Sequence, residues 1–78
     1  MREKKLQCIL SFKNTVDALE MEQIGKKREL PGRLIPLPSV ISAGCGLAWT
    51  TEPENKDLTL SVLKEEGLKP ASVHEIIF

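Results

Sequence analysis

Cys45 stands between Gly44 and Gly46, shortly after the closely spaced prolines Pro36 and Pro38. Glycine has no Cβ, so backbone amides and an incoming molecule can both approach the sulfur closely, while the prolines stiffen the chain before the loop. A thiol has an ordinary pKa of about 8.5, so a reactive cysteine needs hydrogen-bond donors or a cation that favour the thiolate. The spacing therefore predicts single-cysteine chemistry at Cys45.

Donors for such a thiolate are present in the same stretch of sequence. The amides of Gly44, Gly46 and Leu47 could form a nest-like turn around the sulfur, and Ser42 offers a hydroxyl. The candidate site is therefore the thiol of Cys45 with a supporting loop made of Pro36, Pro38, Ser42, Gly44 and Gly46.

The second cysteine, Cys8, lies in an apolar run that is typical of a strand. Free cysteine is among the most buried residue types, so core packing is the expected role of Cys8. The two cysteines could form one disulfide, yet nothing in the sequence indicates export. Because cytosolic thiols usually stay reduced, we expect two free thiols.

Other catalytic and metal-binding patterns are missing from the sequence. His74 is the only histidine, and a lone histidine in a strand is usually structural rather than a general base. Cys45 has no cysteine two or three residues away, which excludes a redox Cys-x-x-Cys pair and a zinc knuckle. The glycines around it lack the lysine of a phosphate-binding loop. We therefore expect neither a metal nor an organic cofactor.

Strands and helices alternate along the chain in an order that fixes the fold class. The pattern predicts a strand over 6–12 and a helix over 15–28, with Asn14 as N-cap and Val16, Leu19 and Ile24 on its buried side. Two further strands follow the Pro31-Gly32 turn, over 33–37 and 47–51.

The second half of the chain repeats the helix–strand order. A capping box of Thr51 and Glu54 with Pro53 in the first turn predicts a helix that ends at Gly67, and 73–78 reads as the last strand. The result is an α+β domain over residues 1–78 with the ferredoxin-like split βαβ order (βαββαβ). It implies a four-stranded antiparallel sheet with two helices on one face.

Composition limits the partners. Eleven basic and eleven acidic residues cancel, and the three aromatic residues are too few for base stacking, so nucleic acid is not expected. No apolar stretch approaches the roughly 20 residues that span a bilayer, so we expect no membrane association and a cytoplasmic protein. The 78 residues give a small core, which is compatible with a homodimer.

The two prolines together with the Ser-x-x-Cys-Gly core of Ser42, Cys45 and Gly46 resemble the selenium/sulfur (Se/S) carrier-like family. The similarity covers nearly the whole chain. Family members often have an arginine directly after the second proline, where this chain has Ser39. The resemblance implies that Cys45 holds sulfur or selenium as a persulfide or selenopersulfide, received from a donor protein and passed to a biosynthetic acceptor.

Such a protein would be a carrier or co-substrate rather than an enzyme with its own turnover. The alternative is a non-catalytic interaction or dimerisation module in which Cys45 is a structural residue. The two glycines beside the cysteine favour the carrier, and Ser39 favours the module.

Overall fold

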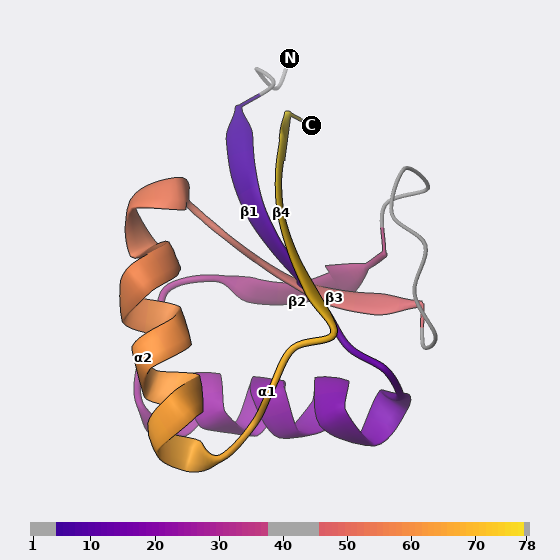
Figure 1. Ribbon diagram of the computed structural model, residues 1–78, viewed down its shortest axis with the longest axis vertical. Helices are drawn as coiled ribbons and strands as arrows, with labels where there is room; N and C mark the ends of the chain where they lie inside the picture. The colour runs from indigo at the N-terminus through magenta and orange to yellow at the C-terminus, as the bar shows by residue number, and fades with distance from the viewer. Residues whose placement is uncertain (1–4, 38–45, 78) are drawn as a thin grey trace.

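The computed structural model describes residues 5–37 and 46–77. Four strands form one sheet: β1 (Leu6–Ser11), β2 (Arg33–Pro36), β3 (Leu47–Thr51) and β4 (Ser72–Ile77). Helix α1 (Thr15–Lys27) links β1 to β2, and the short 3-10 turn η1 (Pro53–Asn55) leads into α2 (Lys56–Glu66), which links β3 to β4. Figure 1 shows both helices on the same side of the sheet.

The sheet order is β2-β3-β1-β4, and all three pairs of neighbouring strands are antiparallel. Strand β1 is central and pairs along its whole length with β4, whereas β2 and β4 are the edges. The predicted α+β class with a four-stranded antiparallel sheet and two helices is confirmed. The placement of Pro36 is explained by this order, because a residue without an N–H is tolerated at an edge strand.

Helix α1 begins as predicted and packs differently from the prediction. The Asn14 side chain accepts a hydrogen bond from the Asp17 N–H at 2.8 Å, as an N-cap does. The expected buried side is wrong in two of its three members, since Val16 and Leu19 are exposed. Ile24 is buried as expected. The other buried residues of the helix are Ala18, Met21 and Gly25. Glycine has a low helix propensity, so Gly25 does not favour a helix in the sequence. Its packing against Trp49 depends on the tertiary structure and could not be predicted from the sequence.

The predicted start of the second helix is wrong. Thr51 is the last residue of β3, so it caps no helix, and the predicted capping box with Glu54 does not form. Pro53 instead opens η1, where its missing N–H costs nothing. The predicted end is confirmed, because Gly67 adopts a left-handed conformation (φ 79°) and its N–H reaches the carbonyls of Leu63 and Lys64.

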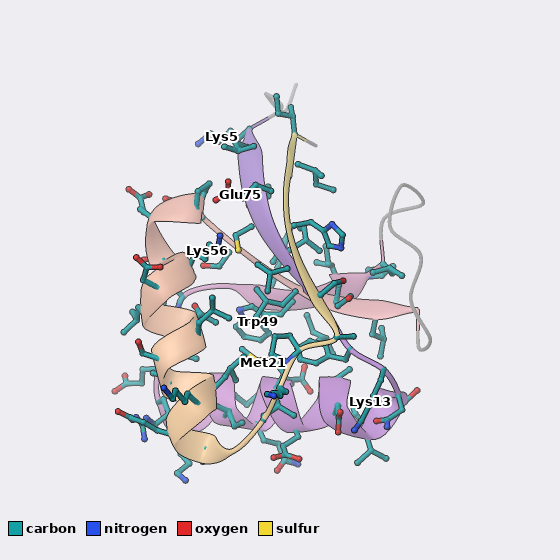
Figure 2. All side chains as sticks on the ribbon, in the orientation of Figure 1. Lys5, Lys13, Met21, Trp49, Lys56 and Glu75 are labelled. Carbon is teal, nitrogen blue, oxygen red and sulfur yellow. The ribbon has the colours of Figure 1, made fainter. Side chains whose placement is uncertain are left out.

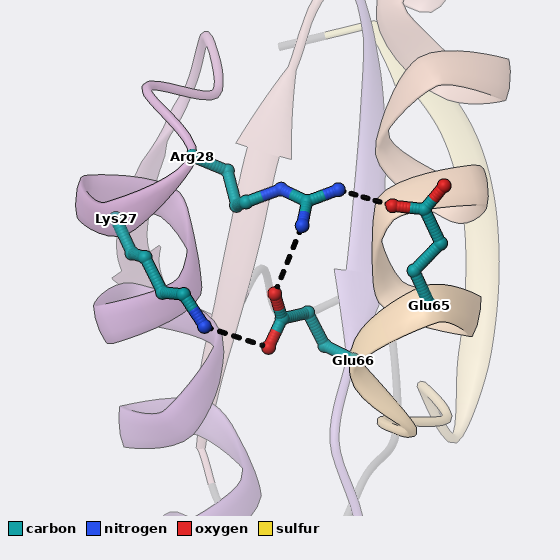
Figure 3. Close-up of polar contacts among 4 residues, drawn as sticks. All are labelled: Lys27, Arg28, Glu65 and Glu66. Atoms are coloured by element: carbon teal, nitrogen blue, oxygen red, sulfur yellow. Dashed lines mark hydrogen bonds and ion pairs between the residues drawn. The ribbon is translucent and has the colours of Figure 1, made fainter.

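The basic end of α1 is tied to the acidic end of α2 (Figure 3). Glu66 accepts from Lys27 at 3.3 Å and from Arg28 at 3.2 Å, and Arg28 also pairs with Glu65. Basic residues in the last turn of a helix suit the negative end of its dipole and are often simply solvated. Here the ion pairs give such residues a structural role, because they join two helix ends that are far apart in the chain.

The core lies between the helices and the sheet. One cluster of buried residues combines the side chains of both helices with those of the sheet face that they cover, including Cys8, Leu10 and Trp49. A smaller cluster on the other sheet face centres on Ile9 and Ala48. The alternation of Cys8, Ile9 and Leu10 between the two clusters follows from the two-residue period of a strand.

The indole of Trp49 packs against α1 at Gly25, a position that has no side chain. A Cβ built on Gly25 would lie 2.5 Å from the Cη2 atom of the indole, which is closer than real contacts allow. Alanine in place of glycine normally stabilises a helix interior by about 1 kcal/mol. Here we expect Gly25→Ala to destabilise the protein by about 1–2 kcal/mol, because overpacking a core costs about 1–3 kcal/mol.

Urea denaturation of Gly25→Ala, Trp49→Phe and the double variant measures this contact. Because the smaller ring of Phe leaves room for the added methyl group, we expect the double variant to be at least 1 kcal/mol more stable than the sum of the single losses implies. Additive losses would show that the indole does not limit position 25. Gln23→Ala, on the exposed side of α1, is the matched control.

Candidate functional site

The predicted cysteine loop is the connection from the edge strand β2 to the inner strand β3. Pro36 is the last residue of β2 and is paired in register with Leu47, the first residue of β3. One residue further out, the Leu37 N–H donates to the Gly46 carbonyl at 2.9 Å. These contacts hold the two ends of the loop together, so its ends are fixed to the sheet.

Most of the predicted site lies outside the described residues. Cys45, Pro38, Ser42 and Gly44 belong to 38–45, so the nest-like turn and the role of the thiol stay predictions. Of the supporting residues, Pro36 and Gly46 are placed, on opposite sides of the loop base.

Gly46 has the backbone conformation for which glycine is suited. Its φ is +74°, in the left-handed region that costs other residues about 1–2 kcal/mol. A Cβ at this position would meet no atom of the described residues within 4 Å, so within that part of the chain the requirement for glycine is conformational. Because Gly46 directly follows Cys45, the turn it makes sets the direction in which the chain enters β3.

Cys8 is a core residue, as predicted. Its side chain is fully buried beneath the helices, and burial raises the pKa of its thiol. Lys56, labelled in Figure 2, lowers the pKa, and Glu75, which is paired in register with Cys8, adds to the rise. A buried thiol with a raised pKa is a poor nucleophile, so Cys8 does not suit transfer chemistry.

Cys8 and Gly46, the described residue next to Cys45, lie beside opposite ends of β3. Cys8 is paired with Thr51, at the opposite end of β3 from Gly46. Five residue steps of about 3.3 Å place Gly46 roughly 16 Å along the strand from Thr51, and a disulfide needs Cα atoms within about 7 Å. A single peptide step from Gly46 to Cys45 spans only about 3.8 Å. We therefore expect Cys8 and Cys45 to stay separate thiols.

The histidine is part of a hydrogen-bonded chain that the sequence did not indicate. His74 Nε2 lies 2.8 Å from the Ser72 hydroxyl, which in turn pairs with the hydroxyl of the buried Ser11. The link to Ser11 depends on the pairing of β1 with β4, which places Ser11 opposite Ser72. No carboxylate among the described residues pairs with the ring, so the arrangement is not that of a catalytic triad. It supports the structural interpretation of His74.

Within residues 5–37 and 46–77, no group of three or more His, Cys, Asp or Glu side chains could hold a metal ion. In the same part of the chain, no helix is both long and apolar enough to cross a membrane.

Comparison with known families decides the assignment. The model of the family described as "Putative Se/S carrier protein-like" matches residues 7–75. The chain belongs to this family. No curated protein and no solved structure matches the chain significantly. The family match therefore confirms the resemblance that the prolines and the Ser-x-x-Cys-Gly core indicated, and it spans both the described framework and the cysteine loop between β2 and β3.

The different environments of the two thiols can be tested by alkylation under native conditions. Cys8 reacts only when the core opens, so we expect it to react about a thousandfold or more slowly than an accessible thiol. In Cys8→Ala one equivalent of iodoacetamide should be taken up rapidly, and in Cys45→Ala uptake should be slow. In guanidinium chloride both variants should react at the same rate. A Cys45→Ala variant that reacts under native conditions as fast as it does in guanidinium chloride would contradict the assignment of Cys8 to the closed core.

Proposed function

We propose that the protein is a Se/S carrier and that Cys45 is the residue that holds the sulfur or selenium atom. The observation that carries this proposal is the family match over residues 7–75. The burial of Cys8 supports the choice of cysteine, because the chain has two cysteines and the core occupies one of them. The protein is then a co-substrate that is loaded and unloaded by others.

The proposed transfer is a thiol–persulfide exchange. The Cys45 thiolate attacks the terminal sulfur of a persulfide on a donor protein, and a new sulfur–sulfur bond forms as the old one breaks. The donor cysteine leaves as a thiolate and takes up a proton, and Cys45 becomes a persulfide with no net oxidation or reduction. The same exchange with a selenium-bearing donor gives a selenopersulfide.

The loop framework supports this chemistry in two ways. The two ends of the loop are anchored to the sheet by the pairing of Pro36 with Leu47 and by the hydrogen bond from Leu37 to Gly46. Because these ends are already ordered, less conformational entropy is lost when the loop binds a partner protein. Gly46 provides a left-handed turn next to Cys45 without a side chain. Pro38, Ser42 and Gly44 complete the proposed loop, with Ser42 as a candidate hydrogen-bond donor to the thiolate.

The remaining parts of the assignment follow from this role. We propose donor and acceptor proteins as partners and the cytoplasm as the compartment, since a persulfide carrier works with reduced thiols. We also assign residues 1–78 to one domain of the ferredoxin-like split βαβ type. The strand order supports this, because each helix connects two strands that have one other strand between them.

Loading by a cysteine desulfurase tests the proposal. The reduced protein is incubated with L-cysteine and the desulfurase, and intact mass is read for the native chain, Cys8→Ala and Cys45→Ala. We expect an added sulfur in the native chain and in Cys8→Ala and none in Cys45→Ala. An adduct that persists in Cys45→Ala, or no adduct with an active sulfur or selenium donor, would contradict the proposal.

The alternative function is a protein-interaction or homodimerisation module. One observation favours it: Leu6 and Ile77, paired across β1 and β4, are both large exposed apolar residues. Sedimentation equilibrium distinguishes the two functions when it is combined with the loading experiment. A dimer that dissociates in Ile77→Ser but is never loaded with sulfur would favour the module.

A further inference from the structure

We propose that a cleft beside Trp49 binds a small zwitterionic amino acid with an apolar side chain. The cleft has a volume of about 380 Å³, which lies within the range of small-molecule sites. It lies between the second half of α1, the turn that follows it and the start of β2, with Trp49 of β3 in its wall. Cys45 has no part in this inference, which does not rest on the proposed carrier function.

The apolar part of the cleft consists of Leu30, Leu34 and the indole of Trp49. Leu34 and Trp49 are paired in register on the sheet face that the helices cover, and Leu30 is buried. A short aliphatic side chain suits this wall, because its contact with the wall removes the apolar surface of both from water and needs no hydrogen bond.

The indole nitrogen is a buried donor that lacks an acceptor. Trp49 is only 4% exposed, and its Nε1 has no hydrogen-bond partner among residues 5–37 and 46–77. Gly32, also in the cleft wall, lies directly beside this atom, since a Cβ there would be 2.6 Å from Nε1. An unpaired buried N–H is unfavourable, because it has lost its hydrogen bonds to water without replacing them. A ligand carboxylate that enters past Gly32, with a small movement of the surrounding side chains, would satisfy it.

Charges of both signs line the same cleft. Its wall includes two acidic and two basic side chains, none of which forms an ion pair within the described residues: Glu22, Glu29, Lys26 and Arg33. Their neighbours Lys27 and Arg28, by contrast, are engaged with α2. Cations in the same cleft as an unpaired N–H suit a carboxylate, and the two glutamate carboxylates suit an ammonium group. Both groups occur together in a free amino acid.

The backbone at Glu29 supports a binding role for this carboxylate. Glu29 follows α1 with a φ of +53°, and it is the only residue other than glycine with a positive φ among those the structure describes. Glycine is the usual residue at such a helix end, because side chains are strained there. The conformation is held by the turn itself, because the Leu30 N–H donates to the Gly25 carbonyl at 2.9 Å and the Glu29 N–H to the Lys26 carbonyl at 3.4 Å. A glutamate where glycine is usual places a carboxylate at the wall of the charged cleft.

Fluorescence gives a direct test, because Trp49 is the only tryptophan and the chain has no tyrosine. The native protein is titrated with L-leucine, with 4-methylpentanoate, which lacks the amino group, and with 3-methylbutylamine, which lacks the carboxylate. We expect saturable changes in emission with L-leucine and at least tenfold weaker binding of either analogue. No saturable change with L-leucine, or equal binding of an analogue, would overturn the proposal.

Charge variants locate the ligand. Lys26→Gln and Glu22→Gln should each weaken L-leucine binding by about tenfold or more, while Lys64→Gln, in the last turn of α2, should leave it unchanged. Glu29→Gly should weaken binding and also raise the Tm by about 4–8 °C, because the strain at this position is removed. A Glu29→Gly variant that is more stable and binds L-leucine with native affinity would contradict a role for this carboxylate in the site.

Discussion

Replacing Trp49 by alanine is expected to lower the free energy of unfolding by about 3–5 kcal/mol, the range observed for large aromatic side chains in cores. The indole is nearly fully buried and lies in the main cluster between the helices and the sheet. Two of its neighbours are glycines, Gly25 and Gly32, which have no side chains that could move into the space. The cavity would therefore stay largely open, which places the loss toward the upper end of the range.

The measurement is urea denaturation followed by far-UV circular dichroism, since the substitution removes the only tryptophan. Trp49→Phe is the matched variant, because it keeps an aromatic ring and should lose less than half as much. Small domains have about 5–15 kcal/mol of stability in total, so a Trp49→Ala chain that is unfolded without urea would meet the prediction. A loss below 1 kcal/mol would show that the indole is not a core residue.

Gly32→Ala is expected to destabilise the protein by about 2–5 kcal/mol, from two independent causes. The φ of Gly32 is +122°, a conformation that strains any L side chain by about 1–3 kcal/mol. The added Cβ would also lie 2.5 Å from the Thr50 carbonyl oxygen, which is part of β3 and cannot move without disturbing the strand.

Gly67→Ala separates these two causes. Gly67 also has a positive φ, +79°, but a Cβ there would meet no atom within 4 Å. Its loss should be limited to the conformational cost of about 1–2 kcal/mol. Denaturation of both variants in parallel should therefore give a larger loss for Gly32→Ala. Equal losses would mean that the contact with Thr50 is relieved by a small shift.

The element order could be predicted because it depends on local signals. Asn14 and Gly67 are residue types that favour the start and the end of a helix. The short apolar run around Cys8 favours a buried strand. The capping box failed for a related reason. Thr51 has the residue type of a cap but is also a good strand residue, and its pairing with Cys8 in the sheet decides the outcome.

The buried side of α1 could not be predicted, because tertiary packing selected it. Val16 and Leu19 are more hydrophobic than Ala18 and Gly25, yet they point to solvent. The indole of Trp49, 24 positions further along the chain, leaves no room for a side chain at position 25, so the side of α1 that carries Gly25 faces the core. The ion pairs from Arg28 to Glu65 and Glu66 likewise depend on how the two helices lie.

The candidate carrier site divides in the same way. Cys45 and its two flanking glycines are predicted from the sequence alone, and the structure describes only Gly46 of these, in a left-handed turn. The cleft at Trp49 has no sequence motif, because it is assembled from α1, the turn after it and two strands. The one signal in the sequence was a pair of glycines, Gly25 and Gly32, on either side of the helix end.

If the protein is a carrier, as proposed, Cys45 should receive sulfur in preference to ordinary thiols. The most direct measurement is a competition in which a desulfurase persulfide labelled with ³⁵S discharges into a mixture of Cys8→Ala protein and free cysteine at equal thiol concentration. We expect most of the label on the protein, and the share on protein should vanish with Cys45→Ala. Label divided between the two thiols in proportion to their ordinary reactivity would contradict a carrier function.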